Sequence, residues 1–226
     1  MGKTIVISLG GSIIIPDKID VEFLKDFKKI IIDFVEKGNK AIIVCGGGKT
    51  CRLYQEAAAK VSNVRNDDLD WIGIHTIRLN AQLVKTLFLG DVHEVVIHNP
   101  NDKVNFKEKV LIAAGWKPGW SSDYDAVLLA KNFNVKTVIN MSDISYVYDK
   151  EPKNNHDARP IKEMSWKKLR KLVGNKWNPG LNVPFGPIAA REAEKLGLEV
   201  VIIKGNDLNN LKKFLDEKEF NGTIIS

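Results

Sequence analysis

The residues best suited to chemistry in this chain begin with a run of three glycines. Gly46, Gly47 and Gly48 follow the apolar stretch "KAIIVC", and Lys49 and Arg52 come shortly after them. Such a run can form a simple tight turn, or it can bring backbone N–H groups against an anion. Arg52 would lie in the first turn of the next helix, where free N–H groups and the positive dipole end suit a phosphate. The guanidinium could bind the same phosphate through two hydrogen bonds.

A second glycine turn, Gly10-Gly11-Ser12, follows the β-branched run "KTIVISL". Glycine pairs after strands are common, and one pair alone indicates no ligand. Two such turns after consecutive parallel strands would meet at the carboxyl edge of a sheet, where open α/β folds bind ligands. Neither turn has the Walker spacing G-x-x-x-x-G-K-[ST] or the dinucleotide spacing G-x-G-x-x-G.

A third candidate is the segment "AGWKPGWSSDYDAVLLA", which follows a predicted strand and opens a helix. Ser121 and Ser122 offer a helix cap and further N–H donors near Asp123. Two interpretations stay open for Asp123 and Asp125. They can belong to a site, or they can only complement the positive end of the helix.

A fourth candidate lies on a largely apolar helical stretch that carries Asp70, Gly73, Arg78 and Asn80. A glycine in mid-helix costs roughly 1 kcal/mol relative to alanine. The position of Gly73 therefore indicates the close approach of a ligand or of another backbone, and core packing alone would also account for it.

Alternating strands and helices must position these candidates. Short β-branched runs bounded by glycine predict strands, and apolar residues at helical spacing predict helices. The predicted strands are 3–9, 40–45, 93–99, 109–115, 136–141, 198–205 and 222–226, and the predicted helices are 20–38, 50–61, 69–90, 124–134, 165–174, 187–197 and 207–218.

This alternation predicts an α/β fold with a mainly parallel sheet covered by helices on both faces. We expect one domain over residues 1–226 with two lobes, about 1–132 and about 133–226. The polar segment 148–163, with two prolines, reads as a surface loop whose length indicates a function.

Composition narrows the class of protein. The 226 residues carry a formal net charge of +6, but the lysines are scattered among acids. Because nucleic-acid binding favours a basic stripe, a protein that handles small anions is the better interpretation. Cys45 and Cys51 are expected to be structural and reduced, and two thiols with four scattered histidines predict no dedicated metal site. No apolar run approaches the ~20 residues of a membrane span, and we expect a cytoplasmic protein.

A series of short motifs in the same order along the chain resembles the amino acid kinase family, and within it the branch of archaeal-type uridylate (UMP) kinases. The resemblance covers nearly the whole chain. The motifs are "SLGGS", "GGGKTCR", Asp70-Trp71-Ile72-Gly73, Arg78-Leu79-Asn80-Ala81, "PGWSSD", "VYDKEP" with "GPIAAR", and a final "GTII".

The resemblance implies a three-layer α/β/α sandwich of the carbamate kinase type, ATP-dependent phosphoryl transfer to UMP, use of Mg²⁺ with ATP, and a homohexamer. The implied phosphate and ATP residues are Gly10, Gly11, Ser12, Ser142, Asp143, Tyr148, Lys150 and Pro152. The implied UMP residues are Gly46, Gly47, Gly48, Arg52, Asp70, Gly73, Lys117, Pro118, Trp120, Ser121 and Ser122. Asp123 would lie at the centre of transfer.

Three positions depart from the family pattern. Ser8 stands where the family has a lysine before the first glycines, and Arg191 replaces a second lysine. The segment 143–146 lacks the acidic residue and the glycine of the family's N-V-D-G. Because serine supplies no charge, we hypothesise that Lys49 replaces the missing cation, and that Lys49, Asp123 and Arg191 are the catalytic residues.

Two alternative functions remain open at this point. One is a kinase of the same family with another small acceptor. Isopentenyl phosphate kinases resemble this branch, but they carry a histidine for the acceptor phosphate, and neither glycine turn here has a histidine nearby. The other is a non-catalytic protein that binds an oxyanion or nucleotide, of the molybdenum-storage kind. Ser8 and the altered segment 143–146 favour that second alternative.

Overall fold

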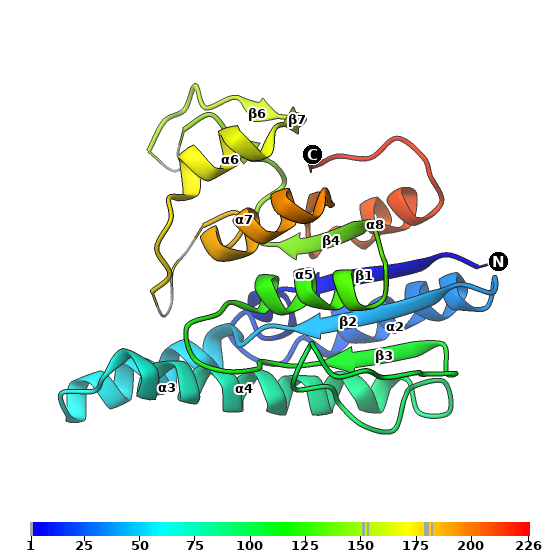
Figure 1. Cartoon of the computed structure of the whole chain (residues 1–226), viewed down its shortest axis with the longest axis horizontal. Coiled ribbons are helices and arrows are strands. Elements are labelled where there is room, and N and C mark those ends of the chain that lie inside the picture. The colour runs from blue at the N-terminus through cyan, green and yellow to red at the C-terminus, as the bar shows by residue number, and fades with distance from the viewer. Residues whose placement is uncertain (1, 151, 153, 179–180, 182) are drawn as a thin grey trace.

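A mainly parallel sheet runs through the whole molecule (Figure 1). The structure is a computed structural model, and it describes residues 2–150, 152, 154–178, 181 and 183–226. Seven strands form this sheet in the order β3-β2-β1-β4-β8-β9-β7. Their bounds are β1 Thr4–Leu9, β2 Lys40–Cys45, β3 Val110–Ala113, β4 Thr137–Ser142, β7 Glu163–Met164, β8 Glu199–Lys204 and β9 Thr223–Ile225. The predicted fold class, a three-layer α/β/α sandwich, is confirmed.

The first strand lies at the centre of the sheet. It pairs in parallel with β2 on one side and with β4 on the other. β3 and β8 extend the parallel sheet, whereas β9 runs antiparallel to β8. Consequently the turns after β1, β2 and β4 all emerge at one edge of the sheet, as Figure 1 shows for β2 and β4.

Helices cover both faces of the sheet. Helices α2, α4 and α8 pack on one face, with Phe27 and Val84 in a core that includes Ile7 and Ile43. Helices α5, α6 and α7 pack on the other face around residues such as Val6. The helix bounds are α1 Gly11–Ile14, α2 Val21–Val35, α3 Gly48–Val61, α4 Asn66–Leu87, α5 Ser122–Asn132, α6 Trp166–Val173, α7 Pro187–Leu196 and α8 Leu208–Leu215. Alternate strand residues thus fill two separate cores, as a pleated sheet requires.

Local signals set the helix ends as the sequence predicts. The side chains of Asp20, Ser165 and Asp207 accept hydrogen bonds from the first turns of α2, α6 and α8. Pro187 occupies the first turn of α7, and Gly197 ends that helix in the left-handed conformation. These features satisfy backbone groups that a helix end leaves unpaired.

Two predictions about secondary structure were wrong. The segment 93–99 forms no strand, because it touches β3 only through the isolated bridges Val92↔Val110 and Ile97↔Ala113. Between the two bridges this segment advances five residues (92 to 97) while β3 advances three (110 to 113), so a regular ladder cannot continue. The segment 148–163 is more than a loop, because β5 (Val147–Tyr148) and β6 (Pro160–Ile161) pair antiparallel within it. Residues 151 and 153 of this segment lie outside the described residues.

Candidate active site

A cavity of about 440 Å³ opens at the carboxyl edge of the sheet. The ends of β1, β2 and β4 lead into it, and residues from α3, α4 and α5 complete its wall. This is the edge at which parallel α/β sheets bind their ligands. Its described lining includes Ser8, Gly10, Ser12, Gly47, Gly48, Arg52, Asp70, Gly73, Trp120, Ser121, Ser122, Asp123, Asn140, Ser142, Asp143 and Trp177.

The two glycine turns pack directly against each other. A Cβ atom on Gly11 would lie 2.0 Å from the backbone nitrogen of Gly48, and one on Gly46 would lie 2.4 Å from that of Gly11. Gly48 also has a φ of +69°, a conformation that favours glycine. The glycines at these contacts are therefore required for the approach of the two backbones, and this approach brings both turns to one cavity.

Asn80 of α4 fixes the second glycine turn through two hydrogen bonds. Its buried amide donates to the carbonyl oxygens of Gly46, at 2.8 Å, and Gly47, at 3.1 Å. Buried carbonyl groups need such partners. This contact explains the asparagine in the motif Arg78-Leu79-Asn80-Ala81, for which the sequence alone suggested no specific partner.

Arg52 is the only lysine or arginine in the described lining of the cavity. It lies near the start of α3, whereas three carboxylates, those of Asp70, Asp123 and Asp143, line the same space. A ligand with several phosphate groups would therefore need positive charge beyond Arg52. In the described part of the chain, no group of three or more His, Cys, Asp or Glu side chains could hold a metal ion.

Asp70 lines the wall that α4 presents to the cavity. One of its carboxylate oxygens, Oδ2, accepts a hydrogen bond from the backbone N–H of Gly119 at 2.7 Å. Gly73 lies one turn further along α4, where a Cβ atom would lie 3.3 Å from Nε2 of Gln55 and 3.4 Å from Sγ of Cys51. Helix packing therefore accounts for part of the need for glycine at this position, although Gly73 also faces the cavity.

Asp123 connects three elements at the back of the cavity. Ser8 donates to its Oδ1 at 3.2 Å, and the backbone N–H of Gly186, just before α7, donates to its Oδ2 at 2.9 Å. Removal of the carboxyl from water raises the pKa of Asp123, and these two hydrogen bonds oppose that rise. Ser121, two residues earlier, caps α5.

Asp125 is buried behind the loop 115–119 and does not line the cavity. Its Oδ2 accepts from the backbone N–H of Trp116 at 3.3 Å, and its Oδ1 has no hydrogen-bond partner among the described residues. Burial raises the pKa of this carboxyl well above its usual value. Arg78 donates to the carbonyl oxygens of Gly115 and Trp116, both at 3.3 Å, so the loop is held from two helices.

The loop 115–119 leads into a stack of aromatic side chains. Trp120 stacks on Tyr124 with ring centroids 4.5 Å apart, and on Trp116 with centroids 6.1 Å apart. The ammonium group of Lys117 lies 4.0 Å above the Trp116 ring. Of these residues, only Trp120 lines the cavity.

Several predicted site residues lie outside the cavity lining. Lys49 points its Nζ at Asp17, 3.6 Å from Oδ1, and its backbone N–H donates to Ile15. Lys150 pairs with Asp157 at 2.6 Å, and Arg191 is exposed on α7. The remaining predicted residues outside the lining are Gly11, Gly46, Lys117, Pro118, Tyr148 and Pro152. The structure therefore does not bring the three predicted catalytic residues together, because Asp123 alone reaches the cavity.

Sequence reasoning missed some of the residues that form the wall. Asn140 is buried near the end of β4, and its amide donates to the carbonyl of Pro184 at 3.2 Å. A polar residue at the carboxyl end of a buried strand was the available signal. Trp177 and Gly186 reach the cavity from the segment between α6 and α7. Gly186 begins the motif "GPIAAR", but no local pattern near Trp177 predicts its position.

Comparisons with known proteins identify the family of the chain. The model of the amino acid kinase family matches residues 3–204. A uridylate kinase of Thermoplasma volcanium is 34% identical, covering 96% of this chain and 95% of its own, and one of Thermoplasma acidophilum is 32% identical, covering 100% and 97%. The crystal structure of uridylate kinase from Archaeoglobus fulgidus superposes with a TM-score of 0.83 at 27% identity, with complete coverage of both chains. Among the described residues, no helix is both long and apolar enough to cross a bilayer.

Proposed function

Because the chain belongs to the amino acid kinase family, we propose that it transfers the γ-phosphoryl group of ATP to UMP, giving ADP and UDP. The observation that carries this proposal is that two glycine turns, Arg52, Asp70 and Asp123 meet in one cavity at the carboxyl edge of the sheet. The relatives named as uridylate kinases, which match over nearly their whole length, support UMP as the acceptor.

The acceptor half of the cavity is assigned to UMP. Gly46, Gly47 and Gly48 approach the acceptor phosphate, and Arg52 binds it through its guanidinium. Asp70 is positioned to accept hydrogen bonds from the ribose, because the Gly119 N–H already orients its carboxylate. The base occupies the space beside Gly73, with Lys117, Pro118, Trp120, Ser121 and Ser122 forming or supporting that wall.

The donor half of the cavity is assigned to ATP. Gly10, Gly11 and Ser12 hold the phosphates that transfer, since their turn packs against the acceptor turn. The ATP base and ribose are assigned to the described part of 142–152, namely Ser142, Asp143, Tyr148, Lys150 and Pro152. In this assignment residues of about 1–132 bind the acceptor and the transferring phosphates, and residues of about 133–226 bind the rest of ATP.

The reaction needs positioning and positive charge more than a protein nucleophile. An oxygen of the UMP phosphate attacks the γ-phosphorus in line, the bond to the β–γ bridging oxygen breaks, and ADP leaves. Mg²⁺ suits this site as a partner of the ATP phosphates, because the described residues offer carboxylates but no protein cage for the ion. When bound, it would neutralise phosphate charge. Arg52 keeps the acceptor phosphate in place, and Lys49 and Arg191 remain proposed as further cations.

The test is a survey of acceptors. The purified protein is given ATP, Mg²⁺ and, in turn, each nucleoside monophosphate and isopentenyl phosphate, and ADP release is recorded. We expect release with UMP only. If ADP is released with a different acceptor instead, that acceptor takes the place of UMP in the proposal. Release with none, despite measurable ATP binding, would contradict the proposed reaction. The same mixture without an acceptor serves as the control for adventitious ATPase.

We also propose that the protein assembles as a homohexamer and works in the cytoplasm. Helices α3 and α4 lie side by side and extend past the sheet (Figure 1), with exposed apolar side chains along both. Leu53, Tyr54 and Val61 on α3 and Trp71 and Leu79 on α4 are at least 41% exposed. Such a surface favours burial between subunits. Light scattering after gel filtration should give about six times the chain mass of 25.3 kDa.

A further inference from the structure

The loop 115–119 is held in place by side chains alone. It leads from β3 towards α5 and enters the cavity wall at Trp120. In the described part of the chain, its backbone groups make no hydrogen bond to any other backbone group. Their hydrogen bonds go to three charged side chains instead, those of Arg78, Asp70 and Asp125. The position of the loop therefore depends on these three residues.

Arg78 fixes the first end of the loop from α4. Its Nε donates to the carbonyl oxygen of Gly115, and its Nη2 to that of Trp116, both at 3.3 Å. The arginine ion pairs among the described residues involve Arg65 and Arg170 and not Arg78. A planar guanidinium can bind two successive carbonyl groups at once, whereas an ammonium group is a single point of charge. The side chain of Arg78 is thus committed to the loop.

The other end of the loop is bound to Asp70, which also lies on α4. The backbone N–H of Gly119 donates to its Oδ2 at 2.7 Å, the only hydrogen bond to this carboxylate among the described residues. Gly119 has a φ of +88° and follows Pro118, so the direction of its N–H group is set by a constrained backbone. Asp70 lines the cavity. The orientation of its carboxylate therefore depends on where the loop holds Gly119.

Arg78 and Asp70 lie eight positions apart on one helix, about two turns, and bind the two ends of the same short loop. Asp125 of α5 accepts the N–H of Trp116, so the backbone of this one residue is held on both sides. Without the guanidinium, the first end of the loop would lose the donors for two of its carbonyl groups. A shift there reaches Gly119 within three residues.

We propose that Arg78 is a positioning residue for the acceptor, which fixes the loop 115–119 so that the loop orients the carboxylate of Asp70. This inference rests on the proposed function, in which Asp70 accepts hydrogen bonds from the ribose of UMP. Arg78 does not line the cavity, so it acts on the acceptor only through the loop. Misplacing a binding group by about 1 Å is enough to weaken its contact strongly.

The test measures the binding of UMP by calorimetry without ATP. Arg78→Ala should raise the dissociation constant of UMP about tenfold, and Arg78→Lys about threefold, because lysine keeps the charge but loses the paired geometry. The dissociation constant of ATP, measured separately, should stay the same in both variants. Unchanged binding of UMP in folded Arg78→Ala would overturn the proposal.

Two double-mutant cycles distinguish positioning from a general disturbance of the site. In an Asp70→Ala background, Arg78→Ala should have less than about a twofold effect on UMP, because no carboxylate remains to be oriented. In an Arg52→Ala background the effect should stay about tenfold, because Arg52 belongs to α3 and is not among the side chains that hold the loop. The same factor in the wild type and in Asp70→Ala would overturn the proposal, as would a factor that shrinks equally in both backgrounds.

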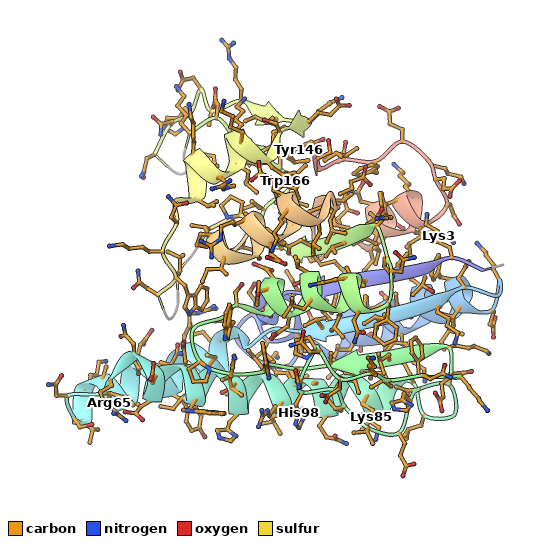
Figure 2. The ribbon with its side chains drawn as sticks, viewed as in Figure 1. Lys3, Arg65, Lys85, His98, Tyr146 and Trp166 are labelled. Atoms are coloured by element: carbon orange, nitrogen blue, oxygen red, sulfur yellow. The ribbon has the colours of Figure 1, made fainter. Side chains whose placement is uncertain are left out.

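Arg78→Lys replaces Arg78→Ala in both cycles if the alanine variant does not fold. Its factor of about three should then vanish in Asp70→Ala and persist in Arg52→Ala. Arg65→Lys is the matched control. Arg65 precedes the first turn of the same helix, far from β3 in Figure 2, and pairs with Asp68 at 3.0 Å. It should leave the binding of UMP unchanged, and equal losses in Arg65→Lys and Arg78→Lys would overturn the role of the loop.

Failure of this inference can be told apart from failure of the proposed function. If the wild type neither binds UMP nor transfers phosphoryl groups to it, the proposed function is wrong and Arg78 has no acceptor to position. If the wild type uses UMP, but the effects of Arg78→Ala and Asp70→Ala simply multiply, only the role of Arg78 is wrong.

Discussion

The hydroxyl group of Ser8 donates a hydrogen bond to Asp123 across the back of the cavity, 3.2 Å from Oδ1. This contact joins the end of β1 to the first turn of α5. The backbone N–H of Gly186, just before α7, donates to the other carboxylate oxygen, Oδ2, so α7 is joined to the same residue. A neutral group thus holds the carboxylate at the position where family resemblance leads us to expect a lysine.

We expect Ser8→Lys to raise turnover several-fold with little change in KM for UMP. An ammonium group at the end of β1 would pair with Asp123 and add positive charge near the transferring phosphates, where preorganised charge is most effective. Steady-state kinetics would measure the change. Ser8→Met is the control for side-chain length without charge. A turnover that falls equally in both variants, with both folded, would show that no cation is needed at this position.

Lys49→Ala should lower turnover by about 10²-fold with a modest effect on UMP affinity, if Lys49 supplies the cation that Ser8 lacks. In the structure its Nζ lies 3.6 Å from Asp17, so it must leave that exposed partner to act. Asp17→Ala removes the partner and should leave turnover at least as high. Wild-type turnover in Lys49→Ala would rule out the role.

Arg52→Ala should raise KM for UMP by about tenfold or more, because it removes the only lysine or arginine in the described cavity lining. Arg52→Lys keeps the charge but loses the two-pronged geometry that matches a phosphate, and should recover only part of the loss. Initial rates at varied UMP would measure this. If Arg52→Ala raises KM for ATP instead of KM for UMP, the assignment of Arg52 to the acceptor phosphate is wrong.

Stability should fall as pH rises above about 4, and Asp125→Asn should reduce this fall. Burial raises the pKa of Asp125 in the folded protein. Between the unfolded value of about 3.9 and the raised value, the folded state binds more protons than the unfolded state, so the free energy of unfolding decreases with pH. One such group contributes at most about 1.4 kcal/mol per pH unit.

Urea unfolding at a series of pH values from 4 to 8 would test this prediction. The slope should become smaller in Asp125→Asn without vanishing, because the pKa of Asp123 is also raised. Asp26→Asn on the exposed side of α2 is a matched control for the loss of one carboxylate, and it should leave the slope unchanged. Parallel slopes in the wild type and Asp125→Asn would contradict the prediction.

Much of the fold could be predicted because its signals are local. Asp20, Ser165 and Asp207 start helices through contacts with residues three positions away, and these contacts form as predicted. The β-branched runs of β1 and β2 end in glycines, so both turns could be assigned to one edge of a parallel sheet. The segment 93–99 looked equally strand-like, but its pairing depends on the register with β3, which is not a local property.

The sequence by itself determined the alternation of strands and helices, the two glycine turns, and the order of the family motifs, because each of these depends on residues close together in the chain. Only the tertiary structure decided that Ser8 contacts Asp123, that Asp125 is buried behind Trp116, and that Lys49 faces Asp17. In each pair the two residues come from different segments of the chain. Their meeting depends on how helices pack on the sheet, and that packing decides which side chains reach the cavity.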